Sequence, residues 1–212
     1  MGLDMYMYKS TKDNIAKHSA LDDLIIAFGE KFPYLDINSD MYKLMFYENA
    51  KYKPTQVAYW RKVNFLHSHI VNTYAAGVDD CQEIFLTKGD ATKILVKLQR
   101  ALAICIKDTC IEVEPDENGG SYHDKPNGKK ILPIIKNDAL DNTSDFVGSC
   151  WRLNDAVADE VSMILPTQGG FFFGSTVYDI WYISDVADAV RTFKSIVDEW
   201  DDDAKYWYEA SW

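Results

Sequence analysis

The chain has 212 residues, of which 47% are hydrophobic, and it carries a formal net charge of −11 at pH 7. This length and composition predict one domain with a substantial hydrophobic core. The acidic balance argues against general nucleic-acid binding and against attachment to anionic membranes, because both need a basic face.

The first half of the chain predicts one strand and two helices. Leu3, Met5 and Met7 alternate with neighbours of a different character, which is the period of a strand with two unlike faces. Residues 19–32 carry apolar side chains at helical spacing. A helix over 54–77 is the clearest prediction, since Pro suits its first turn and Gly its C-terminal cap. The stripe that this helix should bury consists of Val57, Trp60, Asn64, His67, Val71 and Tyr74.

A short strand is predicted at 81–87, followed by a helix that Asp90 can cap. The segment 107–150 is rich in turn residues, including Pro-Asn-Gly, and predicts a hairpin or loop excursion inserted into the domain. The helix that follows Asp90 should turn inward Ile94, Leu95, Leu98, Ala101, Leu102 and Cys105.

The last quarter predicts a helix over 154–165, a strand in FFFGST at 171–176 and a final helix from about Asp185. An acidic, aromatic tail follows at 201–212. Taken together, these elements predict the α+β class, with a small sheet of three or more strands packed against several helices.

The sequence also bears on the cellular compartment. No stretch approaches the ~18 apolar residues that a membrane span needs, and no apolar run follows a basic N-terminal segment. We therefore expect a cytoplasmic protein without membrane contact. Its four cysteines, Cys81, Cys105, Cys110 and Cys150, form no CxxC motif, which predicts reduced thiols.

Asn64 and His67 are two polar residues in the middle of a stripe that should be buried. A buried polar group needs a partner, because leaving its hydrogen bonds unmade costs free energy. His67 is therefore either a core histidine bonded to a carbonyl group or to Asn64, or a residue that lines a pocket. His69 points away from His67 on a helix, so the pair does not predict a metal site.

Tyr59-Trp60-Arg61-Lys62 places two large rings beside two cations. The rings could stack on a ligand. The guanidinium of Arg61 can hold a phosphate or carboxylate with two parallel hydrogen bonds, or it can pair with a surface acid.

The QGGFFFGSTVYD stretch at 168–179 has two interpretations. It is either a structural strand and turn, or a strand that delivers polar groups to a ligand beside Phe173. Gly174 permits a tight turn, and hydroxyl groups next to backbone N–H groups can cradle an anion, although no phosphate-loop lysine follows. The residues that would contact a ligand there are Ser175, Thr176, Tyr178 and Asp179.

Catalytic patterns are scarce. The sequence contains neither GxSxG nor HExxH, and no cysteine stands in a nucleophile motif. This favours a binding protein over an enzyme, with no catalytic residues assigned, no metal and no cofactor.

Four sequence blocks occur here in the order of a known family. They are MGLDMYMYK at 1–9, VAYWRKVNFLH at 57–67, GVDDC at 77–81 and LPTQGGFFFGSTVYD at 165–179. They resemble a family of small uncharacterised bacteriophage and prophage proteins with MGLDMYL, VxYWRKANxIHxWF and GFFFGSTxYD blocks. Where that family has His-x-Trp-Phe, this chain has His67-Ser68-His69-Ile70. The resemblance implies a phage protein in the host cytoplasm and no particular activity.

The resulting hypothesis is a phage accessory protein that sequesters a small nucleotide-like molecule, such as a host immune signal, without turning it over. Rings that can stack on a base and groups that can hold phosphate motivate it. One alternative is an inhibitor that covers a host defence or nucleic-acid-processing enzyme, using residues 198–212. Another is a weak hydrolase built on His67 and Asp179. Homo-oligomerisation is also expected, because a terminus would otherwise expose Trp207, Tyr208 and Trp212.

Overall fold

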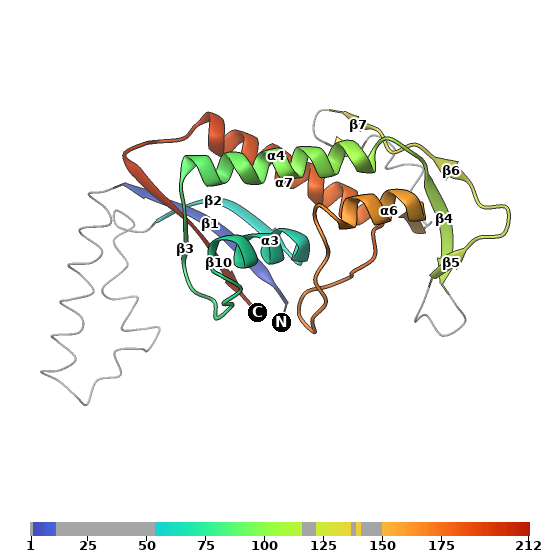
Figure 1. The fold of residues 1–212 in the computed structure, drawn as a ribbon, viewed down its shortest axis with the longest axis horizontal. Coiled ribbons are helices and arrows are strands. Elements are labelled where there is room, and N and C mark those ends of the chain that lie inside the picture. Colours follow the sequence, from blue (N-terminus) through green and yellow to red (C-terminus); the bar gives the residue numbers. More distant parts are fainter. Residues whose placement is uncertain (1, 12–53, 116–121, 137–138, 141–149) are drawn as a thin grey trace, which may run out of the picture.

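The centre of the fold is a four-stranded antiparallel sheet that joins the two ends of the chain (Figure 1). The computed structural model describes residues 2–11, 54–115, 122–136, 139–140 and 150–212, and the helix predicted over 19–32 lies outside them. The strands stand in the order β2-β1-β10-β3. Their bounds are Asp4–Thr11 for β1, Thr55–Arg61 for β2, Ile84–Leu86 for β3 and Ala204–Ser211 for β10.

The N-terminal strand has the two faces that its sequence predicts. Leu3, directly before β1, and Met5 and Met7 within it are 0% exposed, while the residues between them are partly exposed. Successive side chains of a strand point to opposite faces, so the alternation places the apolar set against the core. The predicted strand is confirmed.

The helix predicted over 54–77 is wrong in its first half. That half is the strand β2, and only the second half forms a helix, α3 (Asn64–Tyr74). Lys62, at φ +61°, turns the chain between the two elements. Trp60 lies opposite Met5 of β1 and is 3% exposed. The hydrogen-bonding edge of β1 thus overrides the helical spacing of the apolar residues, because a strand with the same composition can pair there.

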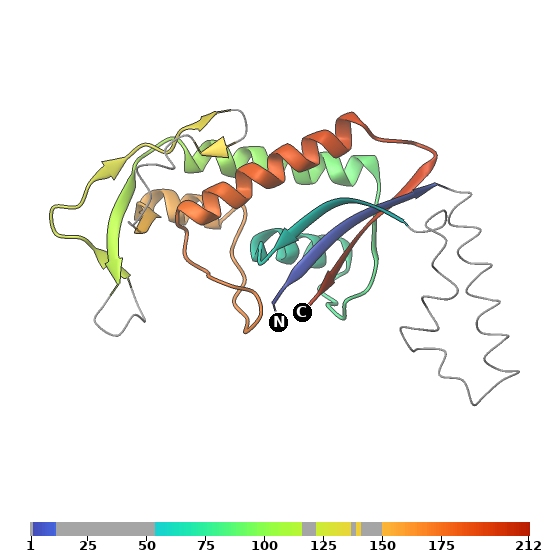
Figure 2. The same cartoon turned by 180° about the vertical axis from the view of Figure 1, so that it is seen from behind.

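Two long helices, α4 (Lys88–Cys105) and α7 (Ile180–Asp198), pack against each other and reach from the main sheet to a second, smaller sheet (Figures 1 and 2). The shorter α6 (Asp155–Ser162) packs against α4 and falls within the predicted 154–165. In the described part of the chain, no helix combines the length and the apolar character needed to span a membrane.

Both long helices begin earlier than predicted, for the same reason. Thr87 caps α4, since its hydroxyl accepts from the Asp90 N–H at 3.2 Å while the Asp90 carboxylate accepts from the Thr87 N–H at 3.1 Å. This reciprocal capping box makes Asp90 the third residue of the helix and not its cap. At α7 the carboxylate of Asp179 accepts from the N–H groups of Trp181 and Tyr182, so Asp179 is the cap and Asp185 lies inside that helix. The predicted inward face of α4 is correct, with Leu102 partly buried and Ile94, Leu95, Leu98, Ala101 and Cys105 fully buried.

The predicted excursion at 107–150 contains most of a second antiparallel sheet. Its strand β4 pairs with β5, β6 and β9, and β9 begins at the last residue of the predicted insertion. Asn127, at φ +59°, lies in the turn between β5 and β6, where Pro-Asn-Gly predicts one. The bounds are Cys110–Pro115 for β4, Tyr122–Asp124 for β5, Lys130–Ile131 for β6, Ile135–Lys136 for β7, Ala139–Leu140 for β8 and Cys150–Leu153 for β9.

The acidic, aromatic segment at 201–212 is not a free tail. Its residues 204–211 form β10, an inner strand of the main sheet. Trp207 and Tyr208 are 6% and 1% exposed, so only Trp212, at 43%, still supports the exposure argument for an oligomer. The fold as a whole is α+β, as predicted.

Native thiol titration is expected to count two reactive cysteines and not four. Cys105 and Cys110 are buried whereas Cys81 and Cys150 are exposed, and all four are free. Burial raises the pKa of both buried thiols to about 12, and the thiolate is the reactive form. Ellman's reagent should therefore modify two thiols rapidly at pH 8 and the other two only in denaturant. Four rapid equivalents in the native protein would contradict the burial of Cys105 in α4 and Cys110 in β4.

Candidate functional site

The QGGFFFGSTVYD stretch folds as a loop and not as the predicted strand. The Phe173 N–H donates to the Gly170 carbonyl at 3.1 Å, and Gly174 follows at φ +89°. A Cβ atom on Gly174 would lie 3.1 Å from the Lys62 Cβ, so a side chain there would be both strained and crowded. Phe171 is 97% exposed. The apolar run does not form a strand because these turns bend it before it can pair.

Asn64 fixes this loop to the first turn of α3. Its amide group donates to the carbonyls of Phe173 at 3.1 Å and Ser175 at 2.8 Å, and its oxygen accepts from the Gln168 N–H at 3.1 Å. The residue is 2% exposed. Three hydrogen bonds to main-chain groups therefore satisfy a buried amide and hold the loop at both of its ends.

His67 is a core histidine, but its partners are not those expected from the sequence. Nδ1 lies 2.8 Å from the Tyr208 hydroxyl and Nε2 lies 2.9 Å from Oδ2 of Asp79. A carboxylate can only accept, so Nε2 carries a proton, and in the neutral imidazole Nδ1 then accepts from the tyrosine hydroxyl. Burial holds the pKa of Tyr208 well above its ordinary value, which keeps its hydroxyl a donor. With His67 only 1% exposed, this network is structural.

The residues before the turn at Lys62 lie on the sheet. Tyr59 is 47% exposed and donates its hydroxyl to Oδ1 of Asp4 at 2.6 Å. Trp60 is buried and stacks on Phe193 of α7 at 5.7 Å between ring centroids. Nε of Arg61 lies 3.7 Å from Oδ1 of Asp4. Arg61 therefore pairs with a surface acid, which is the second of the two roles that the sequence allowed.

The remaining predicted residues give the loop its shape. The Thr176 carbonyl accepts from the Thr167 hydroxyl at 3.0 Å, and the Tyr178 hydroxyl accepts from the Thr167 N–H at 3.1 Å. Asp179 accepts from two N–H groups in the first turn of α7, each at 2.9 Å. Burial nevertheless raises the pKa of Asp179.

A pocket of about 240 Å³ brings part of the predicted site together beside this loop. Asn64, Ser175 and Asp179 line it, and His67 is not among its described lining residues. The arrangement that a hydrolase would need, with His67 and Asp179 on one cavity, is therefore not the one found in this pocket. Further residues that line it are Lys62, Phe65, Trp181, Tyr182 and Asp185.

Replacing Asp185 with Asn is expected to stabilise the protein at neutral and alkaline pH. Burial, followed by the charges of Asp179 and Asp188, raises the pKa of Asp185 to about 7, whereas the unfolded value is about 4. The folded state holds this proton more tightly than the unfolded state does. The protonated Asp185 therefore adds its full contribution to the free energy of unfolding below about pH 4, and this contribution is lost as the pH rises through about 7. From this group we expect the wild type to lose roughly 2–4 kcal/mol between pH 4 and pH 8.

Urea denaturation of the wild type and Asp185→Asn at several pH values measures this difference. Asp198→Asn is the matched control, because Asp198 is on the same helix but 58% exposed and paired with Lys194. If the difference in unfolding free energy between the wild type and Asp185→Asn stays constant from pH 4 to pH 8, the pKa of Asp185 is not raised by folding.

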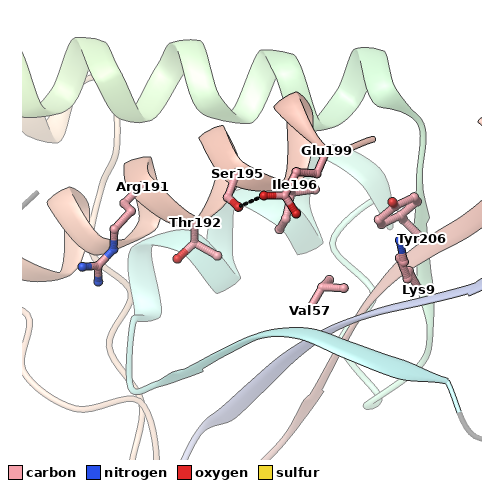
Figure 3. A pocket seen from close by; sticks show the side chains of 8 residues that line it. All are labelled: Lys9, Val57, Arg191, Thr192, Ser195, Ile196, Glu199 and Tyr206. Atoms are coloured by element: carbon pink, nitrogen blue, oxygen red, sulfur yellow. Dashed lines mark hydrogen bonds between the residues drawn. The ribbon is translucent and has the colours of Figure 1, made fainter. Parts of the chain in front are cut away.

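A second pocket, of about 460 Å³, lies between α7 and the core face of the main sheet (Figure 3). Lys9 and Arg191 stand at its opposite ends, and hydroxyl groups of α7 lie between them. The Arg191 guanidinium pairs with Asp188, and the Lys9 ammonium lies 6.0 Å from the centre of the Tyr206 ring. The other residues that line it are Val57, Thr192, Ser195, Ile196 and Glu199.

A third pocket, of about 490 Å³, lies between α4 and the end of α6. Three cations line it together with apolar side chains, and none of the described residues in its lining is aromatic. It offers charge but no ring on which a base could stack. The lining consists of Thr92, Lys93, Val96, Lys97, Arg100, Met163 and Ile164.

The sequence interpretation missed the residues of the α7 pocket. Lys9 stands in β1 at the end of the MGLDMYMYK block, which was not assigned to a site, and Arg191 stands in α7 outside all four blocks. Their only sequence signal is that both are cations in elements with strong apolar periodicity.

No protein-family model matches this chain, and comparisons with curated proteins and with solved structures also find no match.

Proposed function

We propose that this protein binds and sequesters a small nucleotide-like molecule in the pocket between α7 and the main sheet. The observation that carries the proposal is the pair of cations, Lys9 and Arg191, at opposite ends of one pocket in a chain of net charge −11. Binding without turnover would suit a phage accessory protein that withholds a host immune signal in the host cytoplasm, as the sequence resemblance suggests.

The chemistry of the pocket supports such a ligand. A guanidinium carries five N–H donors and can hold a phosphate with two of them while Asp188 occupies another. Thr192 can donate its hydroxyl group to phosphate or ribose. The Ser195 hydroxyl donates to Oε1 of Glu199 at 3.2 Å and can still accept from a ribose hydroxyl, while Glu199 can accept from an amino group of a base. The volume of about 460 Å³ falls within the range of roughly 300–1,000 Å³ typical of small-molecule sites.

The pocket beside the loop is less suited to phosphate. Its two carboxyl groups, Asp179 and Asp185, stand against a single cation, Lys62. An anion would be repelled there once both carboxyl groups are ionised. Its volume of about 240 Å³ also lies below the usual range of small-molecule sites.

Isothermal titration calorimetry with cyclic nucleotides, mononucleotides and ADP-ribose compounds tests the proposal. Arg191→Gln should weaken binding of the responding compound at least ~tenfold, the loss of one charge-assisted contact. Lys62→Gln and Arg100→Gln are matched controls in the other two pockets and should leave binding unchanged. Chromatography should recover the ligand intact.

The outcomes separate the function from its location. Binding that depends on Lys62 or Arg100 instead of Arg191 would keep the function and move the site. If none of these compounds produces a heat of binding at millimolar concentration, the proposed small-ligand function itself is wrong.

A second candidate is an inhibitor that covers a host defence or nucleic-acid-processing enzyme. One observation favours it: Phe171 is 97% exposed on a loop that three hydrogen bonds of Asn64 hold in place. A large ring presented rigidly loses little entropy on binding, which is typical of interface hot spots.

A second copy of the chain could use the same surface, where Trp212 stacks on Phe172 at 6.4 Å between ring centroids. Light scattering of the wild type and Phe171→Ala tests self-association.

A further inference from the structure

The face of the main sheet opposite the α7 pocket carries a continuous row of aromatic rings. The row crosses all four strands: Tyr59 of β2, Tyr6 and Tyr8 of β1, Trp207 of β10 and Phe85 of β3. Neighbouring ring centroids are 5.4 Å apart for Tyr59–Tyr6, 5.9 Å for Tyr6–Tyr8, 5.6 Å for Tyr8–Trp207 and 5.9 Å for Trp207–Phe85. We call these five residues the aromatic row.

The aromatic row is open at its two ends. Tyr59 is 47% exposed and Phe85 is 56% exposed, whereas Trp207 between them is 6% exposed. The opposite face of the same strands holds the core, where Trp60 stacks on Phe193 of α7. Because successive side chains of a strand point to opposite faces, the alternation along these strands explains why one face of the sheet lies in the core. This alternation does not require large aromatic side chains on the face that carries the aromatic row. Surface rings of this size are a typical feature of binding surfaces.

The charges beside the aromatic row favour a cation. The Lys205 ammonium already lies 5.8 Å from the centre of the Phe85 ring, a cation–π contact within the chain. Glu209 pairs in register with Tyr6, so a carboxylate borders the middle of the row. Burial and the nearby Glu83 raise the pKa of Glu209. Two carboxylates that repel each other would be stabilised by an added positive charge between them.

We infer that the aromatic row binds an arginine-rich segment of a partner protein. A guanidinium is planar, weakly hydrated and able to stack on Tyr, Trp or Phe while it donates to a carboxylate. A basic segment also complements the net charge of −11. Single-stranded nucleic acid could stack on the same rings, but its phosphates would meet Glu209, Glu83 and an acidic chain. This surface lies on the other side of the sheet from Lys9 and Tyr206, and its role does not depend on the small-ligand proposal.

Fluorescence anisotropy with labelled nona-arginine and nona-lysine peptides tests the inference. Both peptides carry the same charge, so attraction to net charge alone would bind them equally. Stacking on exposed rings favours guanidinium, and we expect nona-arginine to bind about tenfold more tightly to the full-length protein. The double variant Tyr59→Leu/Phe85→Leu should reduce that ratio to about one, because both altered residues are exposed and lie on the row.

Phe171→Leu is the matched control, since it removes an exposed ring that lies on the loop and not on the sheet. It should leave the preference for nona-arginine unchanged, and circular dichroism should show all variants folded. Equal affinity of the two peptides for the wild type would overturn the inference, as would a preference that survives in the double variant. Tighter binding of labelled oligothymidine than of nona-arginine would also overturn it and assign the aromatic row to nucleic acid.

Discussion

A chain that ends before Ala204 is expected to be unfolded. It would lack β10, which pairs with β1 over eight positions and with β3 over three. The lost strand carries Tyr206, Trp207 and Tyr208, all at most 6% exposed. Burying one such ring contributes on the order of 2 kcal/mol, and loss of three rings together with two hydrogen-bonded ladders is comparable to the ~5–15 kcal/mol that stabilises a whole domain.

Far-ultraviolet circular dichroism and urea denaturation measure this effect. The matched control is the chain that lacks only Trp212, which lies beyond β10 and is 43% exposed, and it should remain folded. A cooperative urea transition in the chain ending at residue 203 would contradict the inner position of β10. A consequence for partner searches is that deleting 198–212 would remove the fold and not simply a binding tail.

Asn64→Asp is expected to cost about 3 kcal/mol or more of unfolding free energy. The wild-type amide donates to the carbonyls of Phe173 and Ser175. A carboxylate of the same shape cannot donate, so both hydrogen bonds are lost and a buried negative charge faces two carbonyl oxygens. Only the hydrogen bond from Gln168 could persist. The destabilisation should appear first in the loop, because Asn64 holds it near both ends.

Urea denaturation of both forms, and limited proteolysis at the exposed Phe171, measure the change. Asn72→Asp is the matched control, because Asn72 stands on the same helix but is exposed and donates to the Ser68 hydroxyl at 3.1 Å. Equal stabilities of the two variants would contradict the role of Asn64 in holding the loop. Slower cleavage in Asn64→Asp than in the wild type would contradict it as well.

In the 168–179 loop, residue type alone predicted two of the residues that line a pocket but not how their polar groups are bonded. Ser175 and Asp179 were expected to offer a hydroxyl and a carboxylate to a ligand, and both do line a pocket. Their groups are nevertheless largely engaged within the chain: the Ser175 hydroxyl accepts from the Val177 N–H at 3.1 Å and Asp179 caps α7. Capping and ligand contact use the same residue types, because both need a small polar side chain beside free N–H groups.

His67 shows the opposite limit. A polar residue on an apolar helical stripe requires a partner, and this much follows from desolvation. Its partners, Asp79 and Tyr208, lie 12 and 141 positions away in the chain. No local pattern relates the three residues, since they meet only when β10 joins the sheet beside α3.

What the sequence determined by itself is the local order: the two-faced strand of Leu3, Met5 and Met7, the buried stripe of α4, and the α+β class. These depend on periodicity, which is a property of neighbouring residues. The tertiary structure alone decided that residues 55–61 form a strand, that the C-terminal segment lies inside the sheet, and that Lys9 and Arg191 share a pocket. Each of these depends on which edge or surface a distant segment finds, and pairing energies between distant segments can exceed local propensities of a few tenths of a kcal/mol per residue.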